Sequence, residues 1–488
     1  MMQKCHYIAG EWVEGVGEAF SSEDPGTGQI VWTGKNAIQE EVNQAVSAAR
    51  ESFVRWSARS FEERVGFIRT FEERLRKGDL AESISQETGK PLWEAKMEVV
   101  SMIQKVTTSI DAYKERCPEK QIPFGASTIH VRHKPHGVVA VFGPFNFPGH
   151  LPNGHIIPAL LAGNTVVFKG SELTPGVSQK MVSYWEELPK GVLNLVQGGP
   201  MTGHYTASHP QIDALFFTGS YATGLALLDI FKKHPEKIVA LEMGGNNPLV
   251  ISDVLDSEAA AYLTIQSAFL TAGQRCTCAR RLILPEGTEG DEFLKVLTQM
   301  ASSLIVGHYT QIPEPFMGPV ISLKSAEHLL NTQALLGTGG GVCLVEMRQI
   351  KENSPLLTPG IMDVTHVTHR SDEEYFGPFL QVIRVPDFEA AIREANHTSF
   401  GLVAAIFTHS QAKFHQFYQQ VRAGVINWNA PTTGASGKAP FGGIGKSGNF
   451  RPSGYYAADY CSYPVTSLEN SDISLPKELL PGLKHGRS

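Results

Sequence analysis

From His136 onward, short runs of β-branched and aromatic residues alternate with stretches of helix-compatible composition. This alternation is typical of a parallel sheet, because each parallel connection needs a crossover that a helix can supply. The fold class is therefore expected to be α/β, with the outline of a nucleotide-binding sheet. The expected strands are Gly137–Phe142, Thr165–Phe168, Val192–Val196, Ala214–Phe217 and Lys237–Leu241, and the expected helices are Pro152–Ala162, Pro175–Glu187, Thr202–Ser208 and Tyr221–Lys233.

A second unit of the same kind follows Glu242. Its first strand is expected at Pro248–Ile251, and a helix is expected to begin at Asp256, a good N-cap residue, and to end at Gly273. The residues expected on the apolar face of this helix are Tyr262, Ile265 and Phe269. Cys276 then lies just past a helix, in a loop position where rigid frames often display reactive groups.

Two further regions flank these units. Ile38–Lys77 and Leu80–Lys114 are charged and helical in period, so we expect them to cover the first sheet. A coiled coil is the alternative, but the apolar heptad breaks too often to favour it. Gln121–Pro135 and Asp459–Glu469 are β-prone and could pair into a small flap. Because open strand edges pair readily, we expect the flap to join copies of the chain into a homodimer or a dimer of dimers.

Composition excludes several classes of function. The 488 residues carry a formal charge of −7 without a basic run, which argues against nucleic acid or an anionic membrane as a partner. No signal peptide or run of about 18 apolar residues is readable. The six cysteines are sparse, which fits reduced thiols in the cytoplasm. Cys276-Thr277-Cys278 could be half of a metal site, but no second pair stands at metal-like spacing, so no metal is expected and Cys278 is interpreted as a small buried residue.

The thiol of Cys276 and the carboxylate of Glu242 are 34 positions apart. Glu242 ends an expected strand and Cys276 follows an expected helix, so both can reach one pocket. A thiolate can attack a carbonyl, and a carboxylate can activate the water that hydrolyses the thioester. A hydrolase without any cofactor would also use this pair.

The segment Phe217–Gly224 passes from a strand directly into a helix. Gly219 permits a close approach of the backbone, Ser220 can donate to a phosphate oxygen, and Gly224 keeps the helix near the sheet. An ordinary strand-to-helix turn is the alternative, because the spacing G-x-G-x-x-G is absent.

Two other strand ends carry polar residues. Lys169 could donate to ribose hydroxyls and Glu172 could accept from a 2′-hydroxyl, whereas Glu172 would repel a 2′-phosphate, so NAD is favoured over NADP. A solvated surface pair is the alternative. Asn146 lies in the loop Phe142–Pro148, and its amide could help a backbone N–H to hold an oxyanion. An asparagine that caps its own backbone would explain this residue as well.

Taken together, these motifs resemble the NAD(P)-dependent aldehyde dehydrogenase superfamily over nearly the whole chain. Six motifs occur in the family order, and that combination is far more specific than any one of them. The six matching motifs are Pro144–Pro148, Phe217–Ser220, Glu242–Pro248, Gly273–Cys276, Glu373–Pro378 and Pro440–Gly443.

The resemblance implies a role for each matching residue. It implies Cys276 as nucleophile, Glu242 as general base, and Asn146 with the Cys276 N–H as the oxyanion hole. The implied NAD-binding residues are Lys169 and Glu172 at the adenosine ribose, Gly219, Ser220, Tyr221, Ala222, Thr223 and Gly224 near the pyrophosphate, Glu374 at the nicotinamide ribose and Phe376 beside the ring. Retention of these residues argues against a cofactor-free hydrolase or an inactive relative. Departures from the family pattern are Thr271, Gly170 and the Gly443–Lys446 segment.

The same resemblance implies a division into domains. Residues 1–120 and 136–244 would form the NAD-binding domain, 245–450 the catalytic domain, and 121–135 with 459–474 the oligomerisation flap.

Three stretches, Glu242–Pro248, Gln274–Arg281 and Trp428–Ser436, most resemble the branch of the family that oxidises N-succinyl-L-glutamate 5-semialdehyde in arginine catabolism by the succinyltransferase route. Glutamate or succinate semialdehyde is the alternative substrate. The N-succinyl substrate is a small molecule but a long aldehyde, with one carboxylate near the amide and another on the succinyl arm, and it needs cations and N–H donors. Arg275 and the turn Gly434-Ala435-Ser436 are the substrate candidates, with His150 and His155 as further ones, although a structural ion pair would explain Arg275 equally well.

Overall fold

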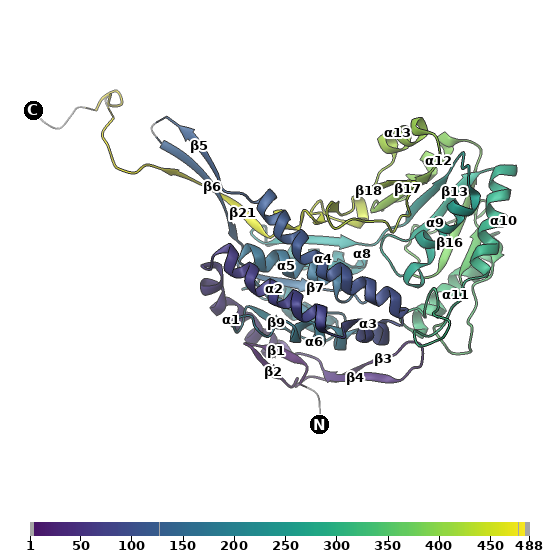
Figure 1. The fold of residues 1–488 in the computed structure, drawn as a ribbon, viewed down its shortest axis with the longest axis horizontal. Coiled ribbons are helices and arrows are strands. Elements are labelled where there is room, and N and C mark those ends of the chain that lie inside the picture. Colours follow the sequence, from purple (N-terminus) through teal and green to yellow (C-terminus); the bar gives the residue numbers. More distant parts are fainter. Residues whose placement is uncertain (1–3, 126, 477, 484–488) are drawn as a thin grey trace, which may run out of the picture.

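The computed structural model describes residues 4–125, 127–476 and 478–483. Within these residues the chain forms two seven-stranded sheets side by side, together with a three-stranded sheet that projects from the body and two short hairpins (Figure 1). The α/β fold class predicted from the alternation is confirmed. No helix in these ranges is long and apolar enough to cross a membrane.

The first sheet has the strand order β11-β10-β7-β8-β9-β1-β2, and the five strands from β11 to β9 are parallel. Residues along β7 alternate between two apolar clusters, with Val139 and Val141 on one face and Val138 and Ala140 on the other. Helices therefore cover both faces, as a doubly wound sheet requires. The strands are β1 (His6–Ile8), β2 (Glu11–Val13), β7 (Val138–Phe142), β8 (Thr165–Lys169), β9 (Leu193–Leu195), β10 (Ala214–Gly219) and β11 (Ile238–Met243).

The helices that connect these strands follow the predicted ones closely, except that the helix predicted to end at Glu187 stops at Ser183. They are α5 (His150–Ala162), α6 (Pro175–Ser183), α7 (Pro200–Ser208) and α8 (Tyr221–Phe231).

Each of the two long N-terminal helical regions is interrupted. Ser60 caps the second helix, because its side chain accepts from the N–H of Glu63 while the Glu63 carboxylate accepts from the N–H of Ser60. Gly89, with a φ of 75°, ends the third helix and Pro91 precedes the fourth. Both regions predicted to be helical are so, with two helices in each, and this capping box and the Gly89-Lys90-Pro91 break mark the interruptions in the sequence. The helices are α1 (Gln39–Ser57), α2 (Phe61–Lys77), α3 (Leu80–Thr88) and α4 (Leu92–Arg116).

The second sheet has the order β14-β15-β16-β13-β12-β17-β18, with only β14 antiparallel to its neighbour. Helix α9 (Ser257–Phe269) begins after Asp256, whose side chain accepts from the Ala259 N–H, as predicted. Its apolar face includes Ile265 and Phe269 but not Tyr262, which is 55% exposed. The other elements are β12 (Asn247–Ile251), β13 (Ala279–Pro285), β14 (Val342–Val345), β15 (Gly360–Asp363), β16 (Phe379–Val385), β17 (Val403–Phe407), β18 (Val425–Trp428), α10 (Thr288–Ser302), α11 (Leu323–Thr338), α12 (Phe388–Ala395) and α13 (Gln411–Gln420).

The segments predicted to pair as a flap do so. β21 (Ser462–Glu469) and β5 (Lys120–Phe124) lie on either side of β6 (Ser127–Pro135), and all pairs are antiparallel. Figure 1 shows these strands extending away from the two large sheets. The remaining elements are the hairpins β3 (Ala19–Glu23) with β4 (Ile30–Lys35) and β19 (Pro440–Phe441) with β20 (Ser453–Gly454), the short helix α14 (Ala457–Tyr460) and two 3-10 turns, Leu270–Gly273 and Gly445–Ser447.

Candidate active site

A cavity of about 1370 Å³ lies where the carboxyl ends of the first sheet's strands meet loops of the second sheet. Ligands of doubly wound proteins bind at this edge of the sheet. Most of the predicted site residues line this one cavity: Asn146, Lys169, Glu172, Gly219, Ser220, Ala222, Thr223, Glu242, Arg275, Cys276, Glu374, Phe376, Ala435 and Ser436. Three predicted residues, Tyr221, Gly224 and Gly434, do not contribute to its wall.

The loop before Cys276 has an unusual backbone. Thr271 and Ala272 follow α9 with φ angles of 56° and 51°, in the left-handed region that non-glycine residues seldom adopt. Gly273 also has a positive φ, and a Cβ there would collide with the carbonyl oxygen of Gly377. The helix predicted to run to Gly273 therefore ends at Phe269, and this turn directs Cys276 to the cavity. Such a backbone persists only when the surroundings hold it.

Two buried side chains hold the Cys276 loop from behind. The Asn247 amide donates to the carbonyl oxygens of Cys276 and Cys278, at 2.7 and 2.9 Å. The Arg280 guanidinium donates to those of Gly273 and Arg275, at 2.7 and 3.0 Å. Sequence reasoning gave neither residue a role, although an arginine inside an otherwise apolar strand signals a buried polar contact.

The Cys276 thiol is held in its protonated form by its surroundings. Burial raises the pKa of Cys276, and the carboxylates of Glu374 and Glu242 raise it further, whereas Arg280 lowers it. A protonated thiol is a weak nucleophile, so the residue needs a proton acceptor when it reacts.

Glu242 fits that requirement. It is buried near the end of β11, and burial raises the pKa of its carboxyl well above the usual value. One of its oxygens, Oε1, accepts from the N–H of Ser453 at 3.2 Å. The other, Oε2, has no hydrogen-bond partner among the described residues. A carboxylate of raised pKa with one free oxygen can take up a proton from a thiol or from water.

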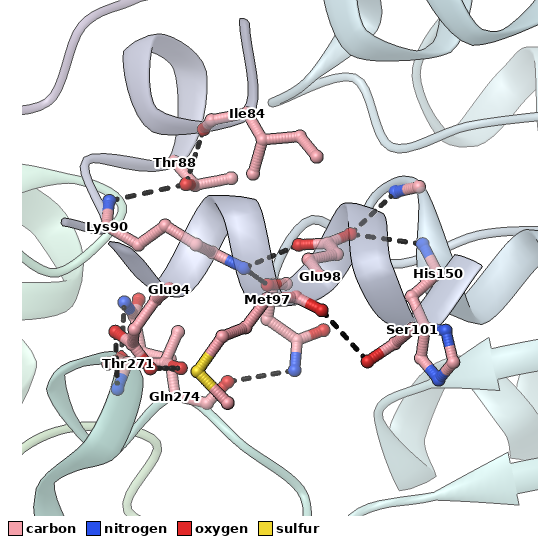
Figure 2. Close-up of polar contacts among 12 residues, drawn as sticks. Ile84, Thr88, Lys90, Glu94, Met97, Glu98, Ser101, His150, Thr271 and Gln274 are labelled. Atoms are coloured by element: carbon pink, nitrogen blue, oxygen red, sulfur yellow. Dashed lines mark hydrogen bonds and ion pairs between the residues drawn. The ribbon is translucent and has the colours of Figure 1, made fainter. Parts of the chain in front are cut away.

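Asn146 lies next to the Cys276 loop. Its Nδ2 donates to the carbonyl oxygen of Gln274 at 2.8 Å. An asparagine NH₂ group has two hydrogens, so one remains for an oxyanion. The backbone carbonyl oxygen of Asn146 accepts from Lys90 at 2.7 Å, and Lys90 forms a buried ion pair with Glu98 at 2.7 Å. Glu98 also accepts from the N–H groups of Gly149 and His150 at the start of α5 (Figure 2).

Glu94, one turn before Glu98 on α4, holds the other loop. It accepts from the N–H and the hydroxyl of Thr271, at 3.1 and 2.8 Å (Figure 2). It also pairs with Arg275 at 2.7 Å, and Arg275 donates to the Thr271 hydroxyl at 2.9 Å. Arg275 lines the cavity, but its charge is already balanced. The structural ion pair, which sequence reasoning left open, is present.

The residues predicted to bind a dinucleotide pyrophosphate surround the start of α8. Ser220 is the N-cap and its side chain accepts from the Thr223 N–H at 3.2 Å. The hydroxyl is thus engaged in capping, while other N–H groups of the first turn remain without helical partners. Gly224 lies inside the helix against Met243, so its role is close packing rather than contact with the cavity.

The predicted ribose-binding groups are also positioned by their neighbours. Lys169 is 8% exposed, donates to the Gly170 carbonyl and lies 3.4 Å from Glu172. Burial lowers the pKa of Lys169. At the far side, Glu374 accepts from the Gly245 N–H at 3.2 Å, and burial raises its pKa to about 7. A Cβ at Gly244 would displace the Glu374 carboxylate from this position.

The remaining substrate candidates differ in what they can offer. The N–H groups of Gly434 and Ala435 donate inside their own loop, to Pro431 and Thr433, so donation to a carboxylate would require breaking these bonds. Both ring nitrogens of His155 are used, by Tyr460 and Thr218. His150 lines the cavity, and its Nδ1 is buried without a partner among the described residues.

The model of the aldehyde dehydrogenase family matches residues 12–466. A curated relative from Pseudomonas fluorescens (strain Pf0-1), N-succinylglutamate 5-semialdehyde dehydrogenase, is 56% identical over 98% of this chain and 99% of its own length. A relative of the same name from Ectopseudomonas mendocina (strain ymp) is 55% identical over the same shares.

A crystal structure of NADP-dependent glyceraldehyde-3-phosphate dehydrogenase from Bacillus halodurans C-125, complexed with NADP, superposes with a TM-score of 0.89. It is 29% identical and covers 96% of this chain and 100% of that one. The chain therefore belongs to the aldehyde dehydrogenase family, which confirms the family predicted from its motifs.

Proposed function

We propose that this protein oxidises N-succinyl-L-glutamate 5-semialdehyde to N-succinyl-L-glutamate with NAD, in arginine catabolism by the succinyltransferase route. The observation that carries the substrate is the 56% identity, over 99% of its length, to a relative named for this semialdehyde. The cavity supports the reaction class, because it brings a thiol, a carboxylate of raised pKa and an amide donor together.

In the proposed reaction Cys276 is the nucleophile. Glu242 takes up a proton through its free Oε2, and the sulfur adds to the aldehyde carbon to give a thiohemiacetal. The second N–H of Asn146 and the Cys276 N–H stabilise the oxyanion. When bound, NAD accepts the hydride that converts the thiohemiacetal to a thioester. Glu242 first releases the proton of the thiol to solvent. It then accepts a proton from the water that attacks the thioester, and the Cys276 sulfur leaves and is protonated again.

The donor set on the cavity wall fits a dinucleotide. The N-terminus of α8 offers N–H groups to a pyrophosphate, with Gly219, Ser220, Ala222 and Thr223 on the cavity wall and Tyr221 in the same turn. Lys169 and Glu172 suit the hydroxyls of one ribose, Glu374 suits those of the other, and Phe376 would lie beside the nicotinamide. Glu172 favours NAD, because its carboxylate would repel a 2′-phosphate.

We also propose the domain division given above, a cytoplasmic location and oligomers that form through the β5–β6–β21 flap. The free thiols of the cysteines support a reducing compartment. The exposed strand β5 supports pairing with another copy.

A rate panel tests the substrate. NADH formation is followed with the N-succinyl semialdehyde, free glutamate semialdehyde and succinate semialdehyde. The proposal expects kcat/KM to be highest for the N-succinyl form by at least about tenfold. The other two aldehydes lack the N-succinyl group, so the site residues that would bind its polar atoms would be left unpaired. A tenfold preference for either of the other aldehydes would contradict the assignment.

A further inference from the structure

The cavity continues past the reacting groups into a recess between α4 and α5. Ser101 and Lys105 on α4, and His150 and Gly154 on α5, line its wall. Glu94, Glu98, Ser101 and Lys105 follow one another on one face of α4, at the three- and four-residue spacing that places side chains in a row. The first two hold the catalytic loops, and Figure 2 shows Ser101 beyond them near His150.

Lys105 is the charged group of this recess. It is 6% exposed, and no hydrogen bond or ion pair joins its Nζ to another residue that the structure describes. Burial lowers the pKa of Lys105 to about 8. A buried ammonium without a counter-charge is costly, so an anionic ligand in the cavity would be bound strongly there.

The recess has room for such a ligand because residue 154 is a glycine. Gly154 lies in the interior of α5, where glycine costs about 1 kcal/mol relative to alanine. A Cβ added there would have no atom within 4 Å beyond its chain neighbours and the backbone of its own helix. Packing in protein interiors leaves few such spaces, so a helix that keeps a glycine beside open volume preserves space in the cavity.

Two further groups surround Lys105. Its Nζ lies 3.8 Å from where a Cβ on Gly437 would be, so the loop that contains Ser436 and Gly437 covers the recess. His150 has an unpartnered Nδ1, and burial lowers its pKa to about 3, so the ring is a neutral donor or acceptor. Arg275, the other cation near the reacting groups, is already balanced by Glu94.

The position of Lys105 along α4 determines which of the two substrate carboxylates it can reach. Glu98, tied through Lys90 to Asn146, marks the level of the reacting groups, and seven residues along α4 are about 10.5 Å. In an extended N-succinylglutamate semialdehyde, roughly eight bonds and about 10 Å separate the aldehyde carbon from the succinyl carboxylate, whereas the α-carboxylate is about 5 Å away.

We propose that the recess of Ser101, Lys105, His150 and Gly154 binds the substrate carboxylate remote from the aldehyde, with Lys105 as its ionic partner. This proposal rests on the proposed function, since it assumes a substrate with a remote carboxylate. It makes Lys105 and Gly154 the residues that set substrate length and charge, and no role for either was predicted from the sequence.

The test compares Lys105→Met with the unmodified protein on three aldehydes: the N-succinyl substrate, N-acetylglutamate 5-semialdehyde, which lacks the remote carboxylate, and butanal. We expect KM for the N-succinyl substrate to rise roughly 10- to 100-fold, as loss of one charge-assisted contact implies. The KM values for the other two should change by less than about threefold. Lys96→Met, an exposed lysine on the same helix, is the matched control and should change none of them.

A second variant tests the volume. Gly154→Leu should lower kcat/KM for the N-succinyl substrate at least about tenfold and leave butanal oxidation within about threefold. The thermal midpoint of each variant shows that it is folded. Lys105→Met removes an unbalanced buried charge, so its midpoint should not fall.

The outcomes separate this proposal from the proposed function. If the unmodified protein does not prefer the N-succinyl over the N-acetyl substrate, the proposed substrate is wrong. If that preference exists but survives Lys105→Met, the recess is wrong and the substrate stands. An equal rise of KM for N-succinyl and N-acetyl substrates would assign Lys105 to the α-carboxylate, and an equal rise for all three would make its role structural; either result overturns the proposal.

Discussion

At the scale of single residues, the site combines a thiol that holds its proton with a carboxyl group that must be ionised to accept one. The pKa of Cys276 and that of Glu242 are both raised, chiefly by burial, and each group's charge would also disfavour the other's. A neutral thiol beside a carboxyl of raised pKa is protected from adventitious oxidation and alkylation, because only the thiolate reacts quickly. The reactive form is therefore scarce at neutral pH in the protein without ligands.

This balance predicts the pH dependence of alkylation. Because the pKa of Cys276 is raised, its thiolate fraction stays small at neutral pH and increases as pH rises. We expect the rate of reaction with iodoacetamide to increase about tenfold per pH unit from pH 7 to 9. Peptide mass mapping gives the rate at Cys276, with the exposed Cys343 as an internal comparison. A rate that levels off below pH 8 would show a lowered pKa and contradict the assignment.

The sequence predicted the site residues that belong to recognisable motifs, but not those whose position depends on packing between elements. Cys276, Glu242 and Asn146 were predicted from their motifs and do line one cavity. Lys105 was not predicted, because a lysine within a charged, helical stretch is expected at the surface. Its burial depends on how α4 packs against α5, and one helix's periodicity does not contain that information.

At the scale of elements, α4 joins the two halves of the candidate site. Glu94 holds the Cys276 loop of the second sheet, and Glu98 holds the Asn146 loop of the first (Figure 2). One helix thus fixes the spacing between the nucleophile and the amide donor. The region predicted to be helical contains both glutamates, but only tertiary packing shows that they are buried.

The buried pair Lys90–Glu98 gives a prediction for stability. Glu98→Gln keeps an acceptor for the N–H groups of α5 but leaves the Lys90 charge unbalanced, so we expect the free energy of unfolding to fall by about 3 kcal/mol. Lys90→Met in the same chain removes that charge. The loss of free energy of unfolding in the double variant should therefore be smaller than the sum of the two single losses by at least about 1.5 kcal/mol. Urea unfolding measures both.

Asp111→Asn, at an exposed position on the same helix, is the control and should change the free energy of unfolding by less than about 0.5 kcal/mol. Strict additivity of the Lys90 and Glu98 variants would show that the two charges do not stabilise each other.

At the scale of the whole molecule, the sequence predicted the alternation of strands and helices but not how the two sheets face each other. The boundaries of β7 to β11 differ from prediction by one or two residues. By contrast, the cavity depends on loops 143–149, 271–276 and 433–437, which come from distant parts of the chain. The first two of these loops are held together by contacts between distant residues, such as the Asn146 amide that donates to the Gln274 carbonyl oxygen.

The flap gives a prediction at this scale. β5 is an edge strand with Ile122 and Phe124 exposed, 48% and 60% respectively. If copies associate through it, replacing both residues with lysine should lower the mass measured by light scattering to that of one chain, since edge charges block strand pairing. Leu255→Lys, at another exposed apolar position, should leave the mass unchanged. An unchanged mass in the flap variant would place the contact elsewhere.

The central claim is that Cys276 performs the first step of the reaction and Glu242 the last. Rapid-mixing measurement of NADH formation by Glu242→Gln tests it most directly, with intact mass determined on the same samples. The account predicts one burst, of no more than one NADH per chain and slower than in the unmodified protein because the thiol has lost its proton acceptor, together with an acyl adduct on Cys276 that outlasts many turnovers of the unmodified protein. Cys276→Ala should show neither. Steady turnover without a burst or an adduct in Glu242→Gln would contradict the account.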